Sequence, residues 1–140
     1  MKHHLEEIGF ETSGPVEFID ITERVRRVLS SSGVKDGLVT VFTRHTTTAV
    51  KINERCERLQ EDMLSFLERA VPGAAYRHDE DTVDGRANAR SHIMSLLLSA
   101  SETVPAAGGE LVLGDWQSIF FVELDGPRER RGVCVKIMGE

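Results

Sequence analysis

The strongest constraint in the sequence is the run Trp116–Leu124 near the end of the chain, where apolar residues occupy both sets of alternating positions. Successive side chains of a β-strand point to opposite faces of the sheet, so this run has two faces of different character. The first face, which we expect to lie in the core, consists of Trp116, Ser118, Phe120, Val122 and Leu124. The second face consists of Gln117, Ile119, Phe121 and Glu123. Its apolar centre and polar ends predict burial against a second subunit.

The other periodic segments predict three helices and several further strands. Apolar residues recur at helical spacing over 21–29, 59–70 and 89–97, and the charged segment 73–84 predicts a loop. Alternating or β-branched runs predict extended chain at 3–12, 16–19, 38–43, 46–52, 103–104, 110–113 and 132–138. Because strands are concentrated in the last third, we expect an α+β fold with a mainly antiparallel sheet and about three helices. The 140 residues are typical of one compact domain, which we place over 1–140.

Charge and composition exclude several classes of function. The formal net charge is −6, from 17 basic and 23 acidic residues, whereas nucleic-acid binding rests on a dense basic footprint. No apolar run approaches the roughly 20 residues needed to cross a bilayer, and the charged start of the chain lacks the apolar core of a secretory signal. The two cysteines, Cys56 and Cys134, have no CxxC spacing, which favours a reduced, cytoplasmic protein. We therefore expect neither a nucleic acid nor a membrane as partner.

Three of the five histidines lie in contexts that suit a metal site. His45 ends a predicted strand, His78 lies in the charged loop and His92 lies on the third helix. A catalytic zinc commonly has three protein ligands and one position open for water, so one imidazole from each element would suffice. Their spacing is not that of an HExxH motif, and the alternative is that the three histidines are unrelated.

Charged residues beside the predicted strands are candidates for catalysis and phosphate binding. Glu54 and Glu123 follow apolar strand residues, where an unpaired carboxylate is costly, so each is a candidate general base or partner of a histidine. For Glu123 the alternative is an ion pair with one of the arginines Arg44, Arg128, Arg130 and Arg131. Arg128 and Arg131 also lie in an arginine-rich turn that suits a phosphate group, although a solvated turn explains them equally well.

Six short motifs together resemble the YjbQ-like family, whose members are often labelled secondary thiamine-phosphate synthases. The motifs are His45–Ala49, Ile52–Glu54, Tyr76–Asp79, Ser91–Ile93, Leu113–Phe120 and Asp125–Arg128, in the family's order. The resemblance implies a compact α+β subunit, a homotrimer, and a polar site near a subunit interface. It carries the family's recurrent histidines over to His45, His78 and His92. Within these motifs Asn53 and Gln117 are substrate-binding candidates, and Asn53 equally suits helix capping.

The family label implies a specific reaction. A hydroxymethylpyrimidine diphosphate would lose pyrophosphate while the ring nitrogen of a thiazole phosphate attacks the methylene carbon. Arg128 and Arg131 would bind the phosphate oxygens, and a divalent ion would neutralise the leaving group. Three histidines favour zinc, whereas diphosphate chemistry usually recruits magnesium through oxygen ligands. The alternatives are a trimeric metal- or metabolite-binding protein without turnover, and a zinc-dependent hydrolase with Glu54 or Glu123 as base.

Overall fold

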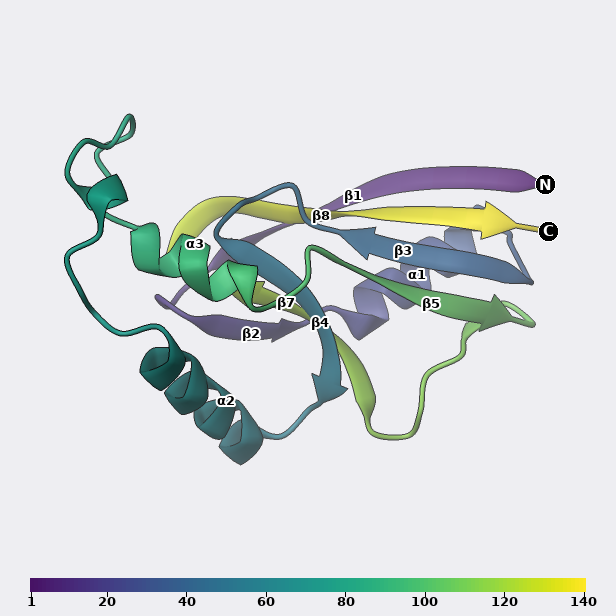
Figure 1. The fold of residues 1–140 in the computed structure, drawn as a ribbon. Coiled ribbons are helices and arrows are strands. Elements are labelled where there is room, and N and C mark those ends of the chain that lie inside the picture. The colour runs from purple at the N-terminus through teal and green to yellow at the C-terminus, as the bar shows by residue number, and fades with distance from the viewer.

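The computed structural model describes residues 1–140, and its strands form two antiparallel sheets (Figure 1). The larger sheet has the order β1–β8–β3–β5–β6, with bounds β1 Lys2–Thr12, β8 Arg128–Gly139, β3 Gly37–Phe42, β5 Ser101–Ala107 and β6 Glu110–Leu111. The smaller sheet has the order β2–β7–β4, with bounds β2 Glu17–Asp20, β7 Gln117–Glu123 and β4 Thr48–Glu54. Every strand pairing is antiparallel.

Three α-helices and one short 3₁₀ turn complete the fold. Their bounds are α1 Thr22–Ser32, α2 Glu57–Ala70, η1 Arg77–Asp79 and α3 Ala89–Leu96. The carboxylate of Asp20 accepts hydrogen bonds from the backbone N–H of Thr22 at 2.9 Å and from its hydroxyl at 2.6 Å, which fixes the start of α1. The same helix ends at Gly33, whose φ of 69° lies in the left-handed region that glycine tolerates. None of the helices is long and apolar enough to cross a membrane.

The strand β7 is central because its two faces contribute to two separate cores. Ile119 and Phe121 are fully buried against α1 and the inner face of the larger sheet. Phe120 and Val122 are buried on the opposite face with residues of α2 and α3. The expected contact of Ile119 and Phe121 with a second subunit is therefore wrong, because elements of the same chain cover them.

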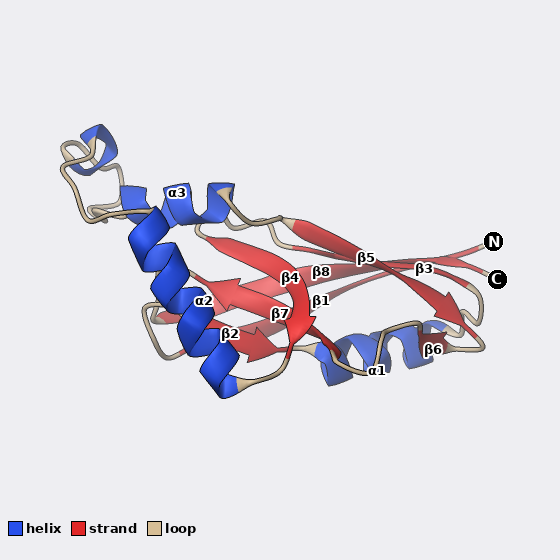
Figure 2. Cartoon of the chain, turned by 60° about the horizontal axis from the view of Figure 1, so that its bottom comes forward, coloured by secondary structure: helices blue, strands red, loops and turns tan.

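The elements form layers, with the smaller sheet between the larger sheet and two of the helices. In Figure 2, α2 and α3 lie to one side of the smaller sheet, and α1 lies beside it under the larger sheet. The two termini lie side by side at one end of the larger sheet (Figure 1). No helix covers the outward face of this sheet, on which Leu5, Leu38, Phe42 and Met138 are exposed.

The structure confirms an α+β fold with antiparallel sheets and corrects the bounds of several elements. The closing strand begins at Arg128 rather than at residue 132, so Arg128 and Arg131 lie in β8 and not in the expected turn. The strand expected to end at Pro105 continues to Ala107. The carbonyl of Pro105 faces β6, where it accepts a hydrogen bond from the backbone N–H of Val112. The nitrogen of Pro105 faces the same side, so the N–H that proline lacks is not needed for the pairing of β5 with β3. The segment 73–84, expected to be a loop, contains η1, which is tied to α3 because Asp79 accepts a hydrogen bond from the backbone N–H of Ala89 at 3.0 Å.

Candidate functional site

A buried carboxylate at the end of β7 holds an arginine in a fixed position. Glu123 is fully buried and forms a bidentate ion pair with Arg131, with N–O distances of 2.8 and 2.7 Å. It also accepts hydrogen bonds from the hydroxyl of Thr12 at 2.8 Å and the backbone N–H of Asp125 at 2.9 Å. Burial alone would raise the pKa of Glu123, but Arg131 and these donors hold it below its ordinary value. Glu123 is therefore ionised at neutral pH, and its ion-pair partner is Arg131.

Asp125 forms a second cluster of charges next to the first. Its carboxylate accepts hydrogen bonds from Arg86 at 3.2 Å, from Asn88 at 2.8 Å and from Arg128 at 2.7 Å. Burial would raise the pKa of Asp125, but these three donors hold it below its ordinary value. Because the amide nitrogen of Asn88 donates to Asp125, its amide oxygen is free to accept a hydrogen bond from Nε2 of His78 at 3.1 Å. Asn88 thus links Asp125 to one of the predicted metal ligands.

His45 lies in the electrostatic field of these arginines. Its side chain is partly buried after β3, and burial is the largest cause of its lowered pKa. Arg131 lowers the pKa further, as do Arg44 and Arg128, whereas Glu123 acts in the opposite direction. The imidazole is therefore neutral at pH 7, and its surroundings favour the arrival of an anion.

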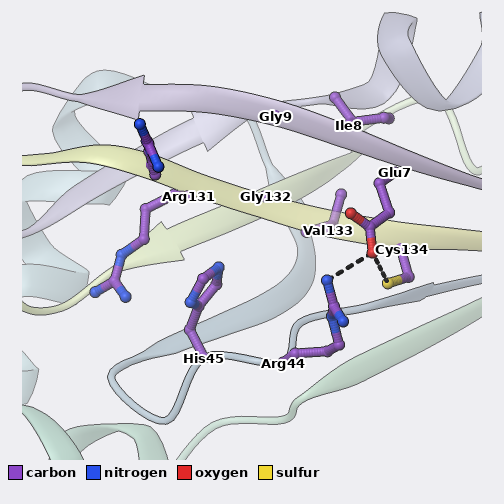
Figure 3. Close-up of a pocket in the computed structure, with 10 residues that line it drawn as sticks. Glu7, Ile8, Gly9, Arg44, His45, Arg131, Gly132, Val133 and Cys134 are labelled. Carbon is purple, nitrogen blue, oxygen red and sulfur yellow. Dashed lines mark hydrogen bonds and ion pairs between the residues drawn. The ribbon is translucent and has the colours of Figure 1, made fainter.

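His45 and Arg131 line a pocket of about 200 Å³ on the larger sheet (Figure 3). Gly9 and Gly132, which pair across β1 and β8, also line it, and a Cβ atom at position 132 would lie 2.6 Å from the carbonyl oxygen of Ile8. Figure 3 shows the imidazole of His45 between the side chains of Arg131 and Arg44. The remaining lining residues are Glu7, Ile8, Arg130, Val133 and Cys134.

The cations of this pocket differ in how firmly they are held. The guanidinium of Arg44 lies 2.6 Å from the carboxylate of Glu7, and Arg131 is fixed by Glu123. Arg130 forms no ion pair within the chain and is exposed at the pocket. The pocket therefore combines one buried guanidinium, one surface ion pair and one cation that is free for a ligand.

The other two histidines lie beside a neighbouring hollow. His92 and His45 both line this hollow of about 470 Å³, and the ring of His78 packs edge-on against that of His92 with centroids 5.0 Å apart. The hydroxyl of Ser95 donates to the carbonyl of Thr46 at 2.9 Å and so holds α3 against the segment that carries His45. No group of three or more His, Cys, Asp or Glu side chains is arranged to hold a metal ion, so the shared zinc site stays a prediction.

Three predicted site residues lie at the far end of the β4–β7 pair. Glu54 is paired with Gln117, whereas Thr48 is paired with Glu123 at the other end. Six steps of roughly 3.3 Å along a strand separate the two ends by about 20 Å. Asn53 and Glu54 are exposed, and the side chain of Asn53 accepts a hydrogen bond from the backbone N–H of Glu54 at 2.8 Å. Within one chain these residues are therefore not brought to the histidines.

Sequence reasoning misses three residues that take part in the hydrogen bonds around Arg128 and Arg131. Asp125 lies in the motif Asp125–Arg128 but receives no role from the sequence, and Arg86 lies in a segment without apolar periodicity. Thr47, whose hydroxyl accepts a hydrogen bond from Arg131 at 2.8 Å, lies in the motif His45–Ala49 and likewise receives no role. Besides the motifs, a second signal is that a carboxylate follows Glu123 by two positions and precedes Arg128 by three.

Comparison with known proteins gives one consistent result. Residues 6–140 match the family described as UPF0047 protein YjbQ-like. A UPF0047 protein of Methanothermobacter thermautotrophicus is 48% identical over 141 residues, which cover 100% of this chain and 95% of that protein. YugU, a UPF0047 protein of Bacillus subtilis, is 35% identical over 138 residues, which cover 96% of this chain and 99% of that protein. A solved YbjQ-like protein of unknown function from Sulfolobus solfataricus is 36% identical, with a TM-score of 0.92 and 99% of each chain covered.

Proposed function

The chain belongs to the YjbQ-like UPF0047 family, and from its own site we propose that it binds the phosphate or diphosphate group of a small metabolite beside His45 and Arg131. The observation that carries the proposal is the charge around His45. Three guanidinium groups and one carboxylate act on its imidazole, although the chain as a whole has a net charge of −6. Local positive charge in a pocket of about 200 Å³ on an acidic protein favours a small anion.

The pocket offers several donors to an anion. Arg130 has no partner within the chain, and Arg44 can share its guanidinium between Glu7 and a ligand. The absence of side chains at Gly9 and Gly132 lets ligand oxygens approach the two strands. His45 contributes an N–H, and a bound anion would favour its protonation.

Among reactions of phosphorylated metabolites, the resemblance favours the joining of a pyrimidine diphosphate to a thiazole phosphate. In that step the bond between the methylene carbon and the diphosphate oxygen breaks, and the ring nitrogen of the thiazole forms the new bond to carbon. The attacking nitrogen carries no proton, so the step needs cations for the departing diphosphate rather than a general base. This requirement agrees with a site in which Glu123 and Asp125 are ionised and paired with arginines.

A metal-dependent function is the second candidate. The closeness of the histidines supports it, although three of them are not arranged around one ion. His78 and His92 are in ring contact, and His92 shares a hollow with His45. In this alternative the chain is a metal- or metabolite-binding protein or a zinc-dependent hydrolase. Zinc in a molar ratio near one per chain after purification without added metal, and its loss in His92→Ala, would support it. Activity that requires added magnesium would favour the synthase.

The proposed assembly is a homotrimer that buries the outward face of the larger sheet. Leu38 and Met138 are paired neighbours on this face, and Phe42 is paired with Cys134 of the pocket. Leu5 continues the exposed apolar surface onto β1. A neighbouring subunit on this face would border the pocket of His45 and exclude water from it, in agreement with the site near a subunit interface that the resemblance implies.

The proposal of anion binding is tested by titrating the purified protein with pyrophosphate in a calorimeter. We expect saturable binding that weakens about tenfold or more in His45→Ala and in Arg130→Ala, because each variant removes a donor to a charged group. Arg69→Ala, which removes an exposed arginine of α2, is the matched control and should bind like the parent protein. Absence of pyrophosphate binding, or equal weakening in the control, would contradict the proposal.

The proposed reaction needs a separate assay. Pyrophosphate release is measured from a hydroxymethylpyrimidine diphosphate with and without thiazole phosphate, in the presence of magnesium or zinc. Release that depends on both substrates and is lost in Arg130→Ala supports the synthase. Binding of pyrophosphate without release under any metal condition would leave a binding protein without turnover.

A further inference from the structure

A second, apolar cavity lies on the side of the smaller sheet that faces away from the ion pair of Glu123 and Arg131. It has a volume of about 330 Å³ between α2 and the smaller sheet, and eight of its eleven lining residues are hydrophobic. Strand residues Phe18, Lys51, Asn53 and Val122 form one side of it, and Leu59, Asp62, Met63, Phe66 and Leu67 of α2 form the other. Leu97 and Leu98, which follow α3, complete the lining.

This cavity exists because α2 packs loosely along most of its length. Leu67 is the only residue of the helix that is fully buried. The C-terminal end of α2 is held by Arg90, which donates hydrogen bonds to the carbonyls of Val71 at 2.7 Å and Glu68 at 3.0 Å. Towards the cavity, Phe66 remains 60% exposed although its position on the helix belongs to the apolar face. A mostly apolar concavity of this size with a few polar groups at its rim is typical of a small-molecule site.

The charges at the rim favour a particular kind of ligand. The ammonium group of Lys51 lies 3.7 Å from the carboxylate of Glu102, so the one cation of the cavity already has a partner. Asp62 forms no ion pair and lies on α2 one position before Met63. The rim therefore has an unpaired negative charge, and the aromatic ring of Phe66 is a further attraction for a cation.

We propose that this cavity binds an amphipathic amine, whose apolar chain fills the space between α2 and the smaller sheet and whose ammonium group lies at Asp62. A volume of about 330 Å³ holds roughly eleven groups of the size of a water molecule, each of which takes ~30 Å³, and an alkyl chain of about eight carbons with its ammonium group is of this size. The site is distinct from the pocket of His45 and Arg131, which we call the anion pocket, because the two share no lining residue.

The test compares three octyl compounds that differ only in their polar end: octylammonium, octanol and octanoate. Binding is followed by ligand-observed NMR at concentrations where none of them aggregates. We expect octylammonium to bind about three- to fivefold more tightly than octanol, as for an exposed ion pair, and octanoate to bind most weakly. Absence of saturable binding of octylammonium, or tighter binding of octanoate, would overturn the proposal.

Two variants and a control locate the binding. Asp62→Asn should remove the preference for octylammonium over octanol, whereas Glu61→Gln, a change of the neighbouring exposed carboxylate, should preserve it. Met63→Trp should fill the cavity and abolish binding of all three compounds while the far-ultraviolet circular dichroism is unchanged. If Asp62→Asn retains the preference, the proposal is wrong. A Met63→Trp protein that binds octylammonium normally but sediments with a lower mass would show that a second copy of the chain occupies this surface instead.

Discussion

At the scale of single residues, the buried ion pair of Glu123 and Arg131 has the largest expected effect on stability. Removing one partner of such a pair leaves an uncompensated buried charge, at a cost of about 3–5 kcal/mol. Glu123→Gln keeps the shape of the side chain, and we expect it to lower the free energy of unfolding in urea at pH 7 by this amount. The exposed Glu129 provides the control, since Glu129→Gln should change stability by less than about 0.5 kcal/mol. A loss as small as that of the control would mean that Arg131 finds other partners.

The same carboxylates predict how stability depends on pH. The pKa values of Glu123 and Asp125 in the folded protein lie below the ordinary values of 4.5 and 3.8, so the unfolded chain binds more protons than the folded chain in this range. The contribution of the two carboxylates to the free energy of unfolding is complete at a pH above their ordinary pKa values. It is lost as the pH falls through these values towards the lower pKa values of the folded protein. The lowered pKa of His45 has the same effect on stability, but it begins at a higher pH. The folded protein loses stability relative to the unfolded chain as the pH falls below 6.5, the ordinary pKa of a histidine.

We therefore expect the urea midpoint to fall between pH 7 and pH 3, most steeply below about pH 4.5, where the carboxylates titrate. Asp125→Asn should be less stable at pH 7 and should show a shallower fall below pH 4, because the titrating group is gone. A midpoint that rises on acidification, or an unchanged slope in Asp125→Asn, would contradict the assigned direction of the shifts.

The sequence predicts part of this residue chemistry and misses the rest for a definable reason. An unpaired carboxylate at a strand end is costly, so the sequence predicts that Glu123 has either an arginine or a histidine as partner. The structure shows that this partner is Arg131. The sequence does not choose between an arginine and a histidine, because the choice depends on how β8 is placed beside the end of β7. Glu54 meets the same local criterion and is exposed, since it lies at the end of β4 where no core element covers it.

At the scale of elements, β7 is the strand on which both cores depend. Phe121 is fully buried in the first core and packs edge-on against Phe10 with ring centroids 4.7 Å apart. We expect Phe121→Ala to lower the free energy of unfolding by about 3–5 kcal/mol, as for other large-to-small changes in a core. Trp116 lies just before the strand and is 76% exposed, so Trp116→Ala should have a much smaller effect in the same urea experiment. Similar losses in the two variants would contradict the burial assigned to β7.

The elements themselves are largely predictable, whereas their layering is not. Apolar periodicity predicts all three helices and most strands, and alternation divides 116–124 into two faces of different character. Alternation alone does not reveal whether the second face of such a strand meets another subunit or another part of the same chain. Ile119 and Phe121 are covered by α1 and the larger sheet because the strands divide into two sheets, and nothing local in the sequence specifies that division.

At the scale of the whole molecule, the two proposed binding sites lie on different sides. The anion pocket opens on the larger sheet near its exposed apolar face, and the apolar cavity lies between α2 and the smaller sheet. The smaller sheet and its two cores separate them. Oligomerisation through the outward face of the larger sheet would therefore affect the anion pocket and leave the apolar cavity open.

The proposed trimer buries the outward face of the larger sheet. We expect sedimentation to give a mass three times the 15.6 kDa of one chain at micromolar concentration. Phe42→Asp places a charge within the outward face and should dissociate the trimer, and its pyrophosphate affinity should fall because the anion pocket loses its neighbouring subunit. Val83→Asp changes an equally apolar residue in the exposed loop before α3 and should leave both mass and affinity unchanged. A parent protein that sediments as a monomer would reject the trimer. Dissociation by Val83→Asp but not by Phe42→Asp would move the interface away from the larger sheet.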